Sequence, residues 1–417
     1  MRLSLTLKTI GASLLIASTA IGAGMLALPL ASASIGFPAA FLLMMIMWSF
    51  MICSALFTFE INLRYGSAQS IAYLAKRVLG RFWHIISFAS IVILFYALLA
   101  AYISGGASSL TSSLGQTPLE NIVSNFSISG WQIIFTLLGC IALIFPASGT
   151  DYINRFFFIF KLGFFILLIS TLFPLIKSEN LLISIPLDFS KTSPYWLAIP
   201  VFFTAFGFHG SIPAIVKYIG PHPKHTRLAI ISGSLFPILF YTLWEVCSLG
   251  TIPMTGDNSF ATLLGQKGEL SLFIDTLSQM SEQGQLIFYV NFFTFFTIIT
   301  SFLAVGMGLH DFFKEFLTNF KIKQTHFLAL LMTVSVPLFV SLLYPDAFVH
   351  ALAFAAVALS FLAVIIPSML VLKMRHNHPY GENTKYRYQV FGGSFMPKFL
   401  ILFGIGIIIA EVYNLLY

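Results

Sequence analysis

Charged residues are scarce in this chain of 417 residues. Asp, Glu, Lys and Arg together make up 9% of it, and 58% of the residues are hydrophobic. Soluble domains carry about 25% charged residues, so this composition excludes a set of water-facing globular domains. Long apolar stretches run from end to end, which instead indicates an all-α integral membrane protein. We expect residues 1–417 to form a single membrane domain.

Cysteine is also scarce, and no metal-binding pattern is present. Cys53, Cys140 and Cys247 are scattered, and each lies in an apolar stretch, which predicts neither a disulfide framework nor a zinc site. The pairs His222/His225 and His376/His378 fall in expected cytoplasmic loops with no carboxylate or cysteine at ligand spacing. We therefore expect no bound metal and no cofactor.

Several catalytic and ion-conducting motifs are absent. The chain has no G-x-x-x-x-G-K-[ST] loop and no H-E-x-x-H pair, which argues against an ATP-driven pump and an intramembrane zinc enzyme. It also shows no charged ring or selectivity filter of the kind that channels use. A secondary transporter is the leading hypothesis, with a channel or an intramembrane enzyme as the more distant alternatives.

Apolar runs of roughly twenty residues predict about eleven transmembrane helices. They lie at 10–34, 38–60, 85–113, 131–147, 153–176, 193–216, 228–250, 285–310, 326–344, 347–373 and 397–416. The first is too long for a cleavable signal peptide and leads directly into the second, so we expect it to remain in the protein.

The positive charges alternate between successive connections. Most Lys and Arg residues fall on the side of the N-terminus. Only three lie on the opposite side, namely Lys177, Lys191 and Lys267. The positive-inside rule then places the N-terminus in the cytoplasm and, after an odd number of crossings, the C-terminus outside. The net charge of +7 thus reflects membrane orientation and predicts no binding to nucleic acid.

The spans divide into two halves of similar length. Residues 1–180 hold five predicted helices, residues 190–375 hold five more, and residues 390–417 hold an extra one. Five is odd, so the second half starts on the opposite side of the membrane from the first. An inverted repeat requires this arrangement.

The first helix of each half is interrupted near its middle. The first contains Gly22, Gly24 and Pro29, and its counterpart contains Gly207, Gly210 and Pro213. Glycine leaves helical geometry at low cost, and proline lacks the N–H that would continue the hydrogen-bond ladder. Non-helical backbone at this depth is tolerated where it is buried in protein or lines a wet cavity.

Paired breaks suit a zwitterionic ligand. The N-terminus of one half-helix offers free N–H groups to an anion, and the C-terminus of the other offers carbonyl oxygens to an ammonium. The alternative is that glycine and proline serve only as packing contacts and kinks, as they often do in membrane helices. Two breaks in corresponding positions favour the binding site.

At these breaks the chain resembles the hydroxy and aromatic amino acid permease family, and within it the tyrosine-specific permeases. The matching stretches are STAIGAGMLALPLA (18–31), LAAYISGGASSL (99–110), NRFFFIFKLGF (154–164), FTAFGFHGSIPAIVKY (203–218), LWEVCSLGTI (243–252) and TSFLAVGMGLHDFF (300–313). The resemblance implies the five-plus-five inverted-repeat fold called LeuT-like, in the APC superfamily, with broken helices 1 and 6. It also implies a proton-coupled symporter of a bacterial inner membrane whose partners are the bilayer and an amino acid.

Tyrosine is the substrate implied first, tryptophan or phenylalanine next, and serine or threonine last. Carried over by position, Gly22, Ala23 and Gly24 would give N–H groups to the substrate carboxylate. Carbonyls around Thr19, Ala20, Thr204 and Ala205 would accept from its amino group. The walls for the aromatic ring would be Tyr96, Tyr102, Phe206, Phe208 and His209, although the chain has 46 Phe residues and most of them serve packing.

Ionisable residues at membrane depth are candidates for proton coupling, because a charge there costs about 2.5–3.5 kcal/mol. Lys161 lies on the fifth helix, where some sodium-independent relatives of the wider fold place a lysine in the region of the sodium site. It is our candidate proton carrier, and a side chain that snorkels to the surface is the alternative. Thr300 and Ser301 are its possible hydroxyl partners or ordinary interhelical hydrogen-bonding residues.

Three further ionisable residues have open roles. His209 is a proton carrier, a donor to substrate or a neutral histidine bonded to a carbonyl. Glu245 stands where the relatives are expected to carry an amide, and it is either protonated or faces an aqueous vestibule. Glu60 precedes Arg64 by four residues, which predicts an interfacial ion pair of little consequence.

Overall fold

The chain folds into helices, as a computed structural model of the protein shows. It describes residues 2–65, 70–115, 125–145, 147–182, 195–220, 222–265, 270–281, 284–322, 325–377 and 388–416. Within those ranges the regular elements are α-helices with short 3₁₀ and π turns, and no strand occurs. Positions 146, 193 and 194 of the predicted spans lie outside these ranges, as do Lys191, Lys267 and His378.

The long helices, alone or joined end to end, can cross a membrane. Among the described residues nine helical spans have the necessary length and hydropathy, and a bent pair of helices makes up to ten. The nine are Gly36–Tyr65 (α3), Arg81–Gly115 (α5), Tyr152–Leu175 (most of α8), Tyr195–Ile219 (α10 and α11), Pro223–Thr251 (α12), Gln285–Thr318 (most of α15), Thr325–Leu343 (α16), Phe348–Asn377 (α17 and α18) and Phe395–Leu416 (α19). The bent pair is α1 (Arg2–Ala20) and α2 (Gly24–Ser32), with an angle of 55° between them.

One predicted span is a shorter helix. The apolar helix α7 (Ile128–Ile144) has 17 residues. At 1.5 Å per residue it extends about 25 Å, less than the roughly 30 Å of a hydrocarbon core. Each predicted segment therefore contains helix, and nine or ten of the spans meet the length expected of a full crossing.

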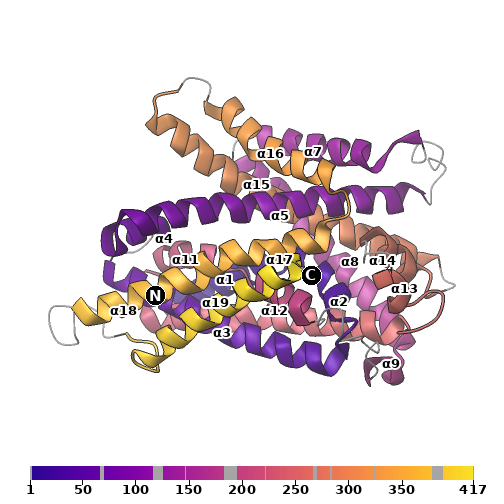
Figure 1. Cartoon of the computed structure of the whole chain (residues 1–417), viewed down its shortest axis with the longest axis horizontal. Coiled ribbons are helices and arrows are strands. Elements are labelled where there is room, and N and C mark those ends of the chain that lie inside the picture. The colour runs from indigo at the N-terminus through magenta and orange to yellow at the C-terminus, as the bar shows by residue number, and fades with distance from the viewer. Residues whose placement is uncertain are drawn as a thin grey trace.

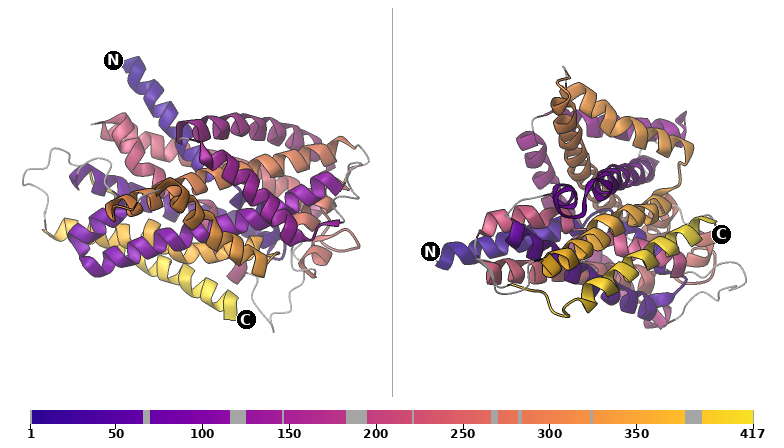
Figure 2. Two further views of the ribbon diagram at one scale, coloured as in Figure 1. Left: turned by 90° about the horizontal axis from the view of Figure 1, so that it is seen from above. Right: turned by 60° about the vertical axis from the view of Figure 1, so that its left-hand side comes forward.

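The helices pack around α5, which runs through the length of the molecule (Figure 1). Helices α7, α15 and α16 contact one another and α5, and α17 packs along α5 as well. Helices α1, α3 and α12 form a second group, in which α12 packs against both others. In both views of Figure 2 the N and C ends lie on opposite sides of the molecule.

Close approaches in this bundle depend on glycine. A Cβ built on Gly139 of α7 would lie 2.1 Å from a ring carbon of Phe302, and one built on Gly106 of α5 would lie 2.5 Å from Phe135. The Phe135 and Phe302 rings meet edge to face, with centroids 5.5 Å apart. Small residues thus let aromatic side chains fill the seam between α5, α7 and α15, as is usual for packing in membranes.

Shorter helices connect the spans. Between α12 and α15 lie α13 (Phe260–Gly265) and α14 (Leu270–Ser278), and α14 packs on α5 and α15. Helix α4 (Ile71–Leu74) and a π turn precede α5, and α9 (Ser178–Leu182) follows α8. The expected cytoplasmic histidine loops are partly helical. Pro223 begins α12 directly after His222, and His376 belongs to the last turn of α18.

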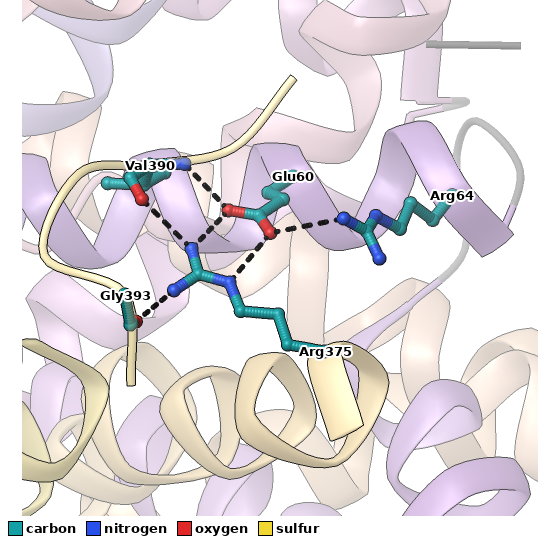
Figure 3. A network of polar contacts seen from close by, with 5 residues as sticks. All are labelled: Glu60, Arg64, Arg375, Val390 and Gly393. Carbon is teal, nitrogen blue, oxygen red and sulfur yellow. Dashed lines mark hydrogen bonds and ion pairs between the residues drawn. The ribbon is translucent and has the colours of Figure 1, made fainter. Parts of the chain in front are cut away.

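The predicted pairing of Glu60 with Arg64 is incomplete, because the main partner of Glu60 is Arg375. The Glu60 carboxylate is fully buried, and it accepts hydrogen bonds from Arg375 Nε at 3.0 Å and Arg375 Nη2 at 2.7 Å. Arg64 lies 3.9 Å away (Figure 3). The backbone N–H of Val390 also donates to Glu60, and Arg375 donates to the carbonyls of Val390 and Gly393. One carboxylate therefore ties together α3, the end of α18 and the segment that enters α19.

Replacing Glu60 with glutamine is expected to destabilise the protein. The substitution leaves the Arg375 guanidinium without its buried counter-charge, and losing one partner of a buried pair costs about 3–5 kcal/mol. The thermal midpoint of the purified protein in detergent should fall by several degrees. Arg64→Ala should lower it less, because that pair is longer. The double variant Glu60→Leu/Arg375→Met should recover most of the loss, and a double variant as unstable as Glu60→Gln would contradict this explanation.

Candidate functional site

The first transmembrane segment is broken where the sequence predicts it. Helix α1 ends at Ala20 and α2 begins at Gly24. Between them the Gly22 N–H donates to the Ala20 carbonyl at 2.8 Å, a tight turn that interrupts the helical ladder. Pro29 lies inside α2, beyond the break. The carbonyls at the end of α1 and the N–H groups at the start of α2 therefore lie within the protein interior.

The second predicted break is also present. Helix α10 (Tyr195–Ala205) stops at Ala205, and α11 (Ile212–Ile219) begins after a 3₁₀ turn at His209–Ser211. The intervening Phe208 N–H donates to the Phe206 carbonyl two residues before it. Pro213 lies in the first turn of α11, where its missing N–H removes no intrahelical bond.

The two breaks lie side by side. Helix α2 packs against α10, and a Cβ built on Gly24 would lie 3.5 Å from the Cα of Ala205. The hydroxyl of Tyr241, on α12, lies 2.6 Å from the carbonyl oxygen of Ala20 and 2.7 Å from that of Ala205. The ends of the two half-helices thus converge on one side chain.

Lys161 reaches the first break from α8. Its Nζ donates to the carbonyl of Ile21 at 2.7 Å, and the residue is 2% exposed. The ring of Phe158 lies 4.6 Å from the same nitrogen. The lysine therefore points into the protein, and its side chain does not snorkel to the surface.

The two hydroxyl residues of α15 differ in what they contact. Ser301 Oγ accepts a 2.8 Å hydrogen bond from the Ala23 N–H and donates to the Thr297 carbonyl of its own helix. Thr300 Oγ1 donates to the carbonyls of Phe296 and Thr297, also within its own helix. Ser301 therefore holds the start of α2, and the Ala23 N–H predicted to meet a substrate carboxylate already has an acceptor.

The predicted aromatic walls divide into two groups. Phe206 and Phe208 are fully buried beside the second break, where Phe206 packs edge-on against Tyr241 and Phe208 stacks on His209. Tyr96 instead donates its hydroxyl proton to the Met332 carbonyl of α16, which directs it away from the breaks.

The other predicted residues near the breaks differ in exposure. Tyr102 on α5 and Thr204 on α10 are buried. The Thr19 side chain is exposed, and it bonds back to the carbonyl of Leu15 in its own helix. Thr19 could therefore contribute only its backbone to an interior site.

Glu245 lies on α12, one helical turn beyond Tyr241. It is 1% exposed, so its carboxylate does not face an aqueous vestibule in this structure. Its Oε2 accepts a 2.8 Å hydrogen bond from the hydroxyl of Ser32 on α2, and its Oε1 has no hydrogen-bond partner among the described residues. Glu245 thus joins α12 to the half-helix that follows the first break.

The sequence alone does not point to Tyr241. This residue lies in an apolar stretch with no glycine, proline or charged residue next to it. Nothing in its local sequence therefore distinguishes it among the 15 tyrosines of the chain. Its role becomes visible only because α12 packs along both α1 and α2.

Comparisons with known proteins give a consistent result along nearly the whole chain. The profile of the tryptophan/tyrosine permease family matches residues 6–411. The chain is 34% identical over 406 residues to tyrosine-specific transport system 1 of Haemophilus influenzae, covering 97% of this chain and 96% of that protein. It is 32% identical to the tryptophan-specific transport protein of the same organism, covering 97% and 95%. It is 29% identical to the low affinity tryptophan permease of Escherichia coli O157:H7, again covering 97% and 95%.

Proposed function

Because the chain belongs to the tryptophan/tyrosine permease family, we propose that it imports an aromatic amino acid, tyrosine foremost, by proton-coupled symport across a bacterial inner membrane. The observation that carries this proposal is the meeting of two broken membrane helices at buried backbone groups. The ends of α1 and α10 bring the carbonyls of Ala20 and Ala205 there, and α2 begins beside them at Gly24. A free amino acid carries the complementary ammonium and carboxylate on neighbouring atoms.

The substrate's backbone groups would each meet one half-helix end. Its carboxylate would lie at the N-terminus of α2, near Gly22 and Gly24, where the helix dipole favours an anion. Its ammonium would meet the carbonyls of Ala20 and Ala205. Phe206 and Phe208, which are both buried beside the second break, are the proposed contacts of the aromatic ring.

The arrangement of the helices supports a five-plus-five inverted repeat. We assign residues 1–180 to the first repeat, residues 190–375 to the second and residues 390–417 to the extra helix. The breaks occur in the first segment of each proposed repeat. The last helix of each proposed repeat also packs against the third span of the other repeat: α8 packs on α15, and α17 packs on α5. An inverted repeat predicts such matching contacts. The positive-inside rule would place the N-terminus in the cytoplasm.

Lys161 is the proposed carrier of the coupled proton. Its amine is buried and bonds directly to the break, through the Ile21 carbonyl. Ser301 supports the break from the other side through the Ala23 N–H. Glu245 and His209, both buried, are the alternative carriers.

Uptake by the purified protein in liposomes tests the function. With an inward proton gradient, labelled L-tyrosine should accumulate, and a protonophore should abolish accumulation while leaving exchange of labelled for unlabelled tyrosine intact. Unlabelled tyrosine should compete best, then tryptophan and phenylalanine, with serine and threonine last. Stronger competition by tryptophan would reverse the substrate order, and accumulation that survives the protonophore would refute proton coupling.

A further inference from the structure

The Tyr241 hydroxyl occupies a point where two backbone carbonyls from different half-helices converge. It lies 2.6 Å from the Ala20 oxygen and 2.7 Å from the Ala205 oxygen, and the residue is fully buried. The carbonyl groups end α1 and α10, which are far apart in sequence. The phenol comes from a third helix, α12. Three oxygens from three helices therefore form one small cluster.

This cluster has more hydrogen-bond acceptors than donors. A phenol has one O–H and can donate to only one carbonyl at a time, so the other short contact joins two oxygens with no proton between them. The Ala20 oxygen also accepts from the Gly22 N–H at 2.8 Å, so two donors, that N–H and the phenol O–H, serve three oxygens in the described contacts. A buried acceptor that is left without a donor costs free energy. The group that best completes such a cluster brings several N–H donors and a positive charge. A primary ammonium does both.

The position of the hydroxyl is set by packing as well as by the carbonyls. The Tyr241 ring packs edge-on against Phe206, with centroids 5.3 Å apart. Helix α12, which carries the ring, also packs against α1, α2 and α3. The phenol is thus held in place before any ligand arrives, which reduces the ordering that binding requires.

We propose that Tyr241 is a positioning residue for the substrate's α-ammonium: its hydroxyl holds the Ala20 and Ala205 carbonyls at the spacing that receives the ammonium. This inference rests on the proposed function, because it assumes that the substrate is an amino acid. It adds a specificity element that acts on the amino group alone. The carboxylate and the ring are recognised elsewhere.

The variant Tyr241→Phe keeps the ring and removes only the hydroxyl. Because the hydroxyl sets the spacing of the carbonyls that receive the ammonium, and small misplacements of a binding group are costly, the KM for L-tyrosine should rise about tenfold or more, with the maximal rate within about twofold of the wild type. Tyramine, which keeps the ammonium, should lose inhibitory potency in parallel. The desamino acid 3-(4-hydroxyphenyl)propionate should inhibit both proteins equally. If the desamino acid inhibits neither protein, the test rests on the KM for L-tyrosine, which should still rise in Tyr241→Phe.

The matched control is Ser232→Ala. It also removes a hydroxyl that joins α12 to α1, through a 2.8 Å hydrogen bond with the Ser13 hydroxyl at a site away from the break, and should leave the KM unchanged within about twofold. An unchanged KM in Tyr241→Phe would overturn the inference. An equal loss of inhibitory potency for the desamino acid in the variant would also overturn it. A third contrary result would be that uptake by the wild type requires Na⁺ and that Tyr241→Phe changes only the affinity for Na⁺. A wild type that transports no amino acid would refute the proposed function, and this inference with it.

A second measurement does not depend on the folding of the variant. Incorporation of 3-fluorotyrosine at position 241 leaves the hydroxyl in place and reports on its surroundings by ¹⁹F NMR. L-tyrosine and tyramine should both shift the resonance at saturating concentration. The desamino acid should not. A resonance that no ammonium ligand moves would overturn the inference.

Discussion

Replacing Lys161 with alanine is expected to abolish proton-driven accumulation of substrate while exchange across the membrane continues. The Lys161 Nζ is buried and donates to the Ile21 carbonyl, inside the break where the substrate is proposed to bind. Alanine has no site for the proton, so occupancy of the binding site would no longer be linked to protonation. Steady-state accumulation in liposomes with an inward proton gradient should fall by about tenfold or more, and counterflow of labelled tyrosine should persist within severalfold.

The variant Lys161→Arg distinguishes two roles for this residue: a proton carrier, and a permanent positive charge that only supports the break. Arginine can still donate to the Ile21 carbonyl, but its guanidinium stays protonated in proteins. If Lys161 carries the proton, Lys161→Arg should therefore also lose proton-driven accumulation. If Lys161 only supports the break, the variant should retain it. Lys217→Ala, which removes an exposed lysine at the end of α11, is the charge-matched control and should accumulate substrate normally. Proton-driven accumulation by Lys161→Ala with substrate binding intact would refute the role.

The sequence predicts those features of the fold that arise from local chemistry. Gly22, Gly24 and the run from Gly207 to Pro213 predict breaks in two membrane helices, and both breaks are present. Apolar runs locate the spans because the bilayer requires them. They do not locate the helix ends, because a helix continues after it leaves the hydrocarbon. Helix α15 thus runs to Asn319, well past the predicted end at residue 310 and through the charged Lys314.

Contacts between distant segments could not be predicted in the same way. A spacing of four residues suggests Arg64 as the partner of Glu60, but Arg375, which lies 315 positions away, is nearer. Tyr241 likewise gains its place only when α12 packs against α1 and α2. Hydropathy shows which segments are buried in the membrane, and tertiary packing decides which polar groups then face one another.

Introducing a branched side chain at the first break is expected to damage substrate binding more than folding. A Cβ built on Gly22 would lie 3.0 Å from Ser301 Oγ, and the two further methyl carbons of valine need additional space. The Gly22→Val variant should therefore displace Ser301, which now accepts from the Ala23 N–H. Because that bond holds the start of α2, the proposed carboxylate site would shift. The KM for tyrosine should rise by about tenfold or more, since small misplacements of a binding group are costly.

A pair of smaller changes tests whether the clash is the cause. Gly22→Ala alone should raise the KM moderately. In the Ser301→Ala background the same substitution should have little further effect, because the oxygen that it would meet is gone. Such non-additivity is the signature of two residues in contact. Gly163→Ala, on α8, adds the same methyl group where nothing lies within 4 Å and should leave transport unchanged. If Gly22→Ala impairs transport equally in both backgrounds, then contact with Ser301 is not what requires glycine at the break, and the altered backbone itself must be responsible.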